Sequence, residues 1–211
     1  MAHVGILTLH GMGNTEPTYA EDLFEEIEDR LGTEDAAKVR MKAVFYQNIL
    51  QEGQAAYFRS VKRRLRWDDL REFMLYGFSD AASLESKKEG EDSPYFQAQM
   101  RSLGGLKVLY NQLSGDDRKV VIVAQSLGGQ VISNYLWDAK PDRAPKHGVF
   151  SVAQVFASAE EEAFCRGRTV KRLLTTGCKF PIFCAGIPRE RITPIDELSP
   201  GFEWQNYYDR D

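Results

Sequence analysis

A strand, a serine and the start of a helix follow one another in Lys119-Val120-Val121-Ile122-Val123-Ala124-Gln125-Ser126-Leu127-Gly128-Gly129. The aliphatic run at 120–124 is typical of a buried strand, and residues 127–137 continue with a helical pattern. A serine at a tight strand-to-helix turn projects its Oγ clear of the backbone, and small neighbours are needed where the main chain approaches the helix. This stretch therefore predicts that the Ser126 hydroxyl is exposed beside the positive end of a helix dipole.

A second glycine-rich loop follows the strand that we expect at residues 4–9. It reads His10-Gly11-Met12-Gly13 and leads to a helix expected at residues 19–31. In acyl transfer, the oxyanion of the tetrahedral intermediate needs two main-chain N–H donors, one from the residue after the serine and one from a loop on a neighbouring strand. Leu127 and Met12 occupy these two positions. The two motifs together predict an acyl-transfer site.

The two motifs resemble those of α/β-hydrolases of the lipase and esterase type. His10-Gly11-Met12-Gly13 is similar to the family's oxyanion loop, and Gln125-Ser126-Leu127-Gly128-Gly129 is similar to its nucleophile elbow. The longer run at 124–133, with Thr176-Gly177-Cys178 and the aromatic stretch at 204–208, resembles a bacterial group to which we can assign no substrate. The resemblance implies a carboxylic-ester hydrolase with Ser126 as nucleophile and Met12 and Leu127 as oxyanion donors. It implies a supporting role for further residues of the two loops, namely His10, Gly11, Gly13, Gln125 and Gly128.

Length and composition indicate a single soluble domain over residues 1–211, and the resemblance implies that this is an α/β-hydrolase domain. Of the 211 residues, 43% are hydrophobic and 27% are charged, which is ordinary for a globular protein. Aliphatic runs are too short for a membrane span, and no targeting segment precedes residue 4, so we expect no integral membrane protein. Three cysteines without Cys-x-x-Cys spacing fit a reducing cytoplasm. A net charge of −4 argues against nucleic acid as the main partner. We expect a small acyl substrate, no cofactor and no metal, and the oligomeric state stays open.

Strands alternate with helices along the chain, which predicts a mostly parallel sheet with helices on both faces. We expect strands at residues 4–9, 39–45, 120–124, 171–175 and 202–207, and helices at 19–31, 54–76, 95–112, 127–137 and within 159–168. The polar segments at 85–94 and 139–148 are expected to be loops.

The segment at 47–111 is longer than a plain crossover between adjacent strands needs. Its first expected helix carries many aromatic residues and the basic cluster Lys62, Arg63, Arg64 and Arg66. Three interpretations stay open. The helix could face the core with a solvated basic side, form a cap as in lipase-like enzymes, or bring the basic cluster to a membrane surface or nucleic acid.

The resemblance places the catalytic acid near the end of the chain. In this family the acid and then the histidine follow the serine. Residues 203–208 look like the last-but-one strand of the fold, running into the acid-bearing loop. Asp211 or Asp209 is therefore the implied acid, and a solvated acidic tail is the alternative.

No histidine follows the implied acid. His3 begins the first strand, and His10 belongs to the oxyanion loop, where its usual part is structural. His147 is the remaining candidate base, since triads are recognised by geometry and not by chain order. Either the final strand, helix and histidine of the fold are missing from these 211 residues, or this member has lost its base. Both cases predict weak or absent turnover, and the second hypothesis is a non-catalytic binding or interaction protein on a hydrolase scaffold.

Overall fold

The computed structural model describes residues 1–13, 15–49, 84, 90–140, 148–154, 156–178, 188–191, 195 and 197–208. Five parallel strands form one sheet in the order β2-β1-β3-β4-β5. They are β1 (Val4–Leu9), β2 (Val39–Val44), β3 (Lys119–Gln125), β4 (Val170–Thr176) and β5 (Glu203–Tyr207). The predicted α/β class and parallel sheet are confirmed, and every strand lies within one residue of its expected bounds.

The described helices follow the predicted pattern. They are α1 (Glu21–Ala36), α4 (Pro94–Gln112), α5 (Leu127–Asp138) and α6 (Ala159–Cys165), with short 3-10 turns η2 (Gly148–Ser151) and η3 (Arg189–Arg191). Helix α1 continues past its expected end because the chain bends at Gly32, at a φ of 71°, and then resumes. The helix expected at 54–76 lies outside the described residues, so the three interpretations of that segment stay open.

Helices α4 and α6 begin at serine caps. The Ser93 hydroxyl accepts a hydrogen bond from the Phe96 N–H at 3.1 Å, and the Ser158 hydroxyl accepts one from the Glu161 N–H at the same distance. Such caps satisfy N–H groups that have no partner inside the helix and stabilise each start by about 1 kcal/mol.

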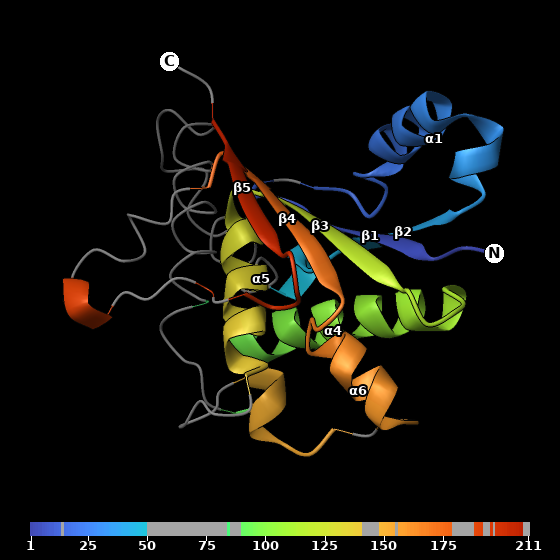
Figure 1. The fold of residues 1–211 in the computed structure, drawn as a ribbon. Helices are drawn as coiled ribbons and strands as arrows, with labels where there is room; N and C mark the ends of the chain where they lie inside the picture. Colours follow the sequence, from blue (N-terminus) through green and yellow to red (C-terminus); the bar gives the residue numbers. More distant parts are fainter. Residues whose placement is uncertain are drawn as a thin grey trace, which may run out of the picture.

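The sheet carries helices on both faces. Figure 1 shows α1 on one side of the sheet and α4, α5 and α6 on the other. Toward α4, α5 and α6 the strands present fully buried side chains at every second position, such as Leu7, Ile122 and Leu173. Gly105 lets α4 approach closely, since a Cβ there would lie 2.9 Å from Leu7 Cδ1. The main core therefore lies between the sheet and these three helices.

The strand order reverses direction between β1 and β3. The chain runs from β1 outward to β2, then returns past β1 to β3 and continues through β4 to β5. In open α/β sheets, ligands bind beyond the carboxyl ends of the strands at such a switch point. The loop after β1 and the turn after β3 flank this point. They are the two segments that carry the glycine-rich motifs of the sequence.

Candidate functional site

Ser126 forms the turn between β3 and α5. Its backbone has a φ of 46° and a ψ of −113°, and no other non-glycine residue of the described chain has a positive φ. Holding such a conformation costs about 1–3 kcal/mol, and the surrounding structure must enforce it. The Ser126 N–H donates to the Thr176 carbonyl at 2.8 Å, and the Ser126 carbonyl accepts from the Gly129 N–H at 3.0 Å. The strained strand-to-helix turn that the sequence predicts is therefore present.

Gly128 lets the first turn of α5 lie directly against the end of β1. A Cβ at this position would be 2.6 Å from the His10 carbonyl oxygen and 2.7 Å from that of Leu9. Side chains do not approach main-chain atoms so closely, so only glycine fits without a shift of the backbone. The contact carries the Ser126 turn toward the loop that follows β1.

The loop after β1 meets Ser126 through Gly11. A Cβ on Gly11 would lie 3.2 Å from the Ser126 Cβ, which places this glycine directly beside the serine. Met12 follows it and is partly buried against the core. Leu127 is the first residue of α5, so its N–H lies in the first helical turn and has no acceptor inside the helix. The structure thus brings together the two loops that the sequence assigns to one site.

His10 is buried and both of its ring nitrogens are occupied. The side chain is 3% exposed, Nδ1 donates to the Gly11 carbonyl at 2.8 Å, and Nε2 accepts from the Tyr46 N–H at 3.2 Å. The ring stacks on Tyr46 at 4.0 Å between centroids, and the Tyr46 hydroxyl donates to the His10 carbonyl. Burial lowers the pKa of His10, and the bond to Gly11 offsets this only in part. His10 is thus a neutral ring that shapes the loop, with no nitrogen left to act as a base on Ser126.

The burial of His10 makes stability depend on pH. Because its pKa is lower in the folded than in the unfolded chain, the unfolded chain binds more protons below the ordinary histidine pKa of about 6.5. The contribution of the neutral His10 ring to the free energy of unfolding is complete above about pH 6.5. It is lost as the pH falls toward the folded-state pKa, by at most about 1.4 kcal/mol per pH unit. Urea unfolding at pH 8 and pH 5.5 should show a larger loss of stability for the wild type than for His10→Gln. Equal losses would contradict the buried neutral ring.

Cys178 supports the serine turn from the loop that follows β4. Its Sγ–H donates to the Ser126 carbonyl at 3.3 Å. Burial raises the pKa of this thiol, although hydrogen bonds to it act in the opposite direction. The thiol is therefore protonated near neutral pH and is no competing nucleophile. The sequence analysis assigned Cys178 no role; its position just after the carboxyl end of a neighbouring strand was the signal that could have placed it here.

An open pocket of about 440 Å³ lies over the carboxyl ends of β3, β4 and β5. It is lined by Gln125, Ser126, Thr176, Gly177, Tyr207 and Tyr208. The strand register places Gln125 beside Thr176, and Thr176 beside Tyr207. Sequence analysis predicted Ser126 and Gln125 for this site. It missed the residues of β4 and β5, because their part depends on which strands are neighbours.

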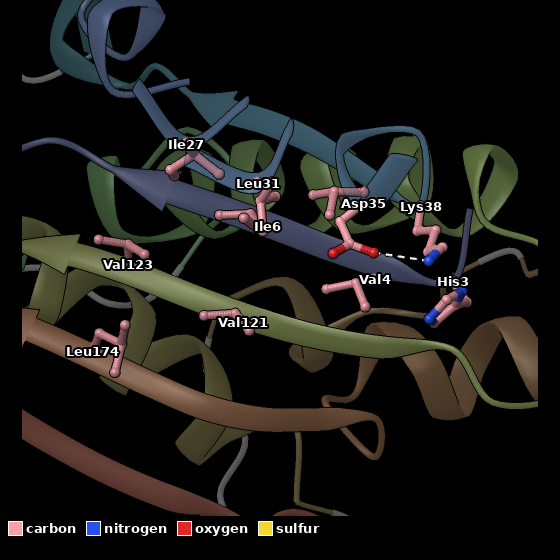
Figure 2. A pocket seen from close by; sticks show the side chains of 11 residues that line it. His3, Val4, Ile6, Ile27, Leu31, Asp35, Lys38, Val121, Val123 and Leu174 are labelled. Carbon is pink, nitrogen blue, oxygen red and sulfur yellow. Dashed lines mark hydrogen bonds and ion pairs between the residues drawn. The ribbon is translucent and has the colours of Figure 1, made fainter. Parts of the chain in front are cut away.

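A second hollow of about 420 Å³ lies on the α1 side of the sheet. Figure 2 shows aliphatic side chains from β1, β3, β4 and α1 around it, with the Asp35–Lys38 ion pair at one end. That ion pair has an N–O distance of 2.7 Å. The described residues that line this groove include no hydroxyl or thiol, and two of its ionisable side chains, Asp35 and Lys38, are paired with each other, so the groove has no counterpart of the Ser126 turn. The pocket at Ser126 is therefore the candidate site for chemistry.

The predicted acid and base belong to segments that flank the described part of the site. Asp209, Asp211 and His147 lie outside the described residues. His3 precedes β1 at the amino end of the sheet, about 20 Å of strand away from the loop after β1. Neither histidine of the described chain can thus serve Ser126, and His147 stays the predicted candidate base.

No protein-family model matches the sequence, and a search of curated proteins finds no match. Among the described helices, none has both the length and the apolar character needed to cross a membrane. Nor do the described residues include a group of three or more histidine, cysteine, aspartate or glutamate side chains that could hold a metal ion.

Proposed function

We propose that the protein is a serine hydrolase of the α/β-hydrolase type that cleaves a carboxylic ester, with Ser126 as the nucleophile. The observation that carries this proposal is the strained Ser126 turn with Gly11 packed against it. Backbone strain persists only where the surroundings enforce it, and it concentrates at functional sites. The position of both loops at the switch point of the sheet supports the same conclusion.

The proposed reaction follows from this geometry. The Ser126 Oγ attacks the ester carbonyl carbon and gives its proton to a general base. The N–H groups of Met12 and Leu127 hold the oxyanion of the tetrahedral intermediate, and the positive end of α5 favours the same charge. Collapse of this intermediate expels the alcohol, which takes up the proton and leaves an acyl-serine. Water then attacks the acyl-serine, and the carboxylic acid is released.

The acid and base remain part of the proposal. Asp211 or Asp209 would orient the base, and His147 is the base candidate that the sequence offers. The free thiols of Cys165 and Cys178 agree with a reducing compartment, and we propose the cytoplasm as the location.

A binding protein on a hydrolase scaffold is the second candidate. The observation that favours it is that His10, the histidine of the described chain nearest to Ser126, already uses both ring nitrogens. Such a protein would keep the pocket without turnover.

Hydrolysis of a phenyl ester separates the two candidates. We expect Ser126→Ala to lower kcat/KM by about a thousandfold or more, because loss of the nucleophile removes the covalent route. Ser151→Ala is the matched control, since this exposed hydroxyl donates to the Gly148 carbonyl at 2.7 Å, outside the site. Equal rates for the wild type and Ser126→Ala would favour the binding protein. A His147→Ala variant measured in parallel shows whether the base is His147.

A further inference from the structure

Two exposed tyrosines border the pocket at Ser126. Tyr207 is 55% exposed and Tyr208 is 77% exposed, and both line the pocket. None of the other large hydrophobic side chains exposed on the described surface is aromatic. Exposed aromatic side chains on a rigid element are favourable contacts for a ligand, because they offer a large surface with few rotatable bonds. Their position at the pocket points to a ligand that uses them.

Main-chain hydrogen bonds fix Tyr207 relative to Ser126. The Ser126 N–H donates to the Thr176 carbonyl at 2.8 Å, and the Gly177 N–H donates to the Tyr207 carbonyl at 3.1 Å. The Tyr207 hydroxyl in turn donates to Gln205 Oε1 at 2.9 Å. Neighbouring strands lie about 4.8 Å apart, so two strand spacings separate the β3 and β5 rows by about 10 Å. The Tyr207 backbone is therefore held about one small-molecule length from the serine, and Tyr208 follows it directly.

Between Ser126 and the two tyrosines, the described part of the chain leaves an open and uncharged floor. Gly177 has a φ of 58°, and a Cβ on it would meet no atom of the described residues within 4 Å, so no side chain of the described chain fills this space. The described residues that line the pocket include no charged side chain. A volume of about 440 Å³ lies within the range of small-molecule sites.

We propose that the ligand of this pocket is an ester that carries an aromatic ring, with the ring packed against Tyr207 and Tyr208. The position of the ester carbonyl at Ser126 rests on the proposed function. The ring contact does not, because it depends only on the pocket. Aromatic pairs prefer offset or edge-to-face packing, and this gives an aromatic ring an advantage over a saturated ring of equal size.

Binding to the Ser126→Ala protein tests the ring contact without turnover. The probes are methyl 4-phenylbutanoate and methyl 4-cyclohexylbutanoate, which have the same chain length and number of ring carbons. Titration followed by NMR should give about fivefold tighter binding of the phenyl ester, with shifts of the Tyr207 and Tyr208 ring signals. Alanine at both tyrosines should remove this preference, and phenylalanine at both should keep it. The cyclohexyl ester is the more hydrophobic probe. A binding preference set by hydrophobicity alone would therefore favour the cyclohexyl ester, which is the opposite of the expected result.

Equal affinity for the two probes, or a preference that survives in the double alanine variant, would overturn the proposal. The binding result for the aromatic ring can be distinguished from the result for the proposed hydrolase activity. Ring-selective binding without hydrolysis by the wild type would leave the ring contact intact and reject the hydrolase. Ester hydrolysis by the wild type without ring-selective binding would support the hydrolase and reject the ring contact.

Discussion

Replacing Gly128 with alanine is expected to lower the free energy of unfolding by about 3 kcal/mol or more. The new Cβ would lie 2.6 Å and 2.7 Å from two carbonyl oxygens of the β1 end, and main chain cannot move aside as a side-chain tip can. Overpacking of a core typically costs about 1–3 kcal/mol, and a clash with backbone is at or beyond the upper end of this range. Urea unfolding measures the change.

Two other helix glycines provide matched controls for Gly128→Ala. Gly104 is on the exposed side of α4, and a Cβ there meets nothing within 4 Å, so Gly104→Ala should raise stability by about 0.5–1 kcal/mol. The Cβ of Gly105→Ala would meet side-chain atoms of Leu7 and Val44 at 2.9 Å and 3.0 Å and no backbone atom. Its effect on the free energy of unfolding should lie between those of Gly104→Ala and Gly128→Ala. If Gly128→Ala were as stable as Gly104→Ala, the close packing of α5 on β1 would be wrong.

Ser126→Gly is expected to abolish ester hydrolysis and at the same time to stabilise the fold. Glycine removes the nucleophile, and the expected loss in kcat/KM is about a thousandfold or more. It also relieves the positive φ of 46°, which costs serine about 1–3 kcal/mol. The greater freedom of glycine in the unfolded chain lowers the free energy of unfolding by about 0.5–1 kcal/mol. The net increase in the free energy of unfolding should therefore be about 1 kcal/mol. Urea unfolding and phenyl ester hydrolysis measured on the same preparation test both parts.

A parallel loss of stability and activity in Ser126→Gly would contradict this account. It would mean that Ser126 is kept for its packing and that its backbone strain serves no reaction. Ser126→Ala helps to separate the two effects, because alanine removes the hydroxyl but retains the strained backbone. We therefore expect Ser126→Ala to be inactive and close to the wild type in stability.

The sheet could be predicted from sequence because its signals are local. Aliphatic runs such as 120–124 and the glycines that follow them mark where strands end and helices begin, and every predicted strand formed. The helix start at Leu127 was also predicted to the residue. The end of α1 was missed because the bend at Gly32 does not end the helix, and the chain resumes helical geometry after it.

The remaining parts of the site depend on contacts between distant segments. Gly177 and Tyr207 join the pocket only because β4 lies between β3 and β5, and this order cannot be read from either segment alone. The hydrogen bond to His10 Nε2 depends in the same way on Tyr46, which follows β2. Local pattern thus located the serine and the loop beside it, while the walls of the pocket required the sheet order.

Covalent capture of the nucleophile tests the central claim most directly. The protein is incubated with an excess of a fluorophosphonate, and the modified residue is identified by peptide mass spectrometry. We predict one phosphonate per chain, carried by Ser126, absent from Ser126→Ala and unchanged in Ser151→Ala. An adduct on a different residue, an adduct that persists in Ser126→Ala, or a wild-type chain that stays unmodified would contradict the assignment of Ser126 as the nucleophile.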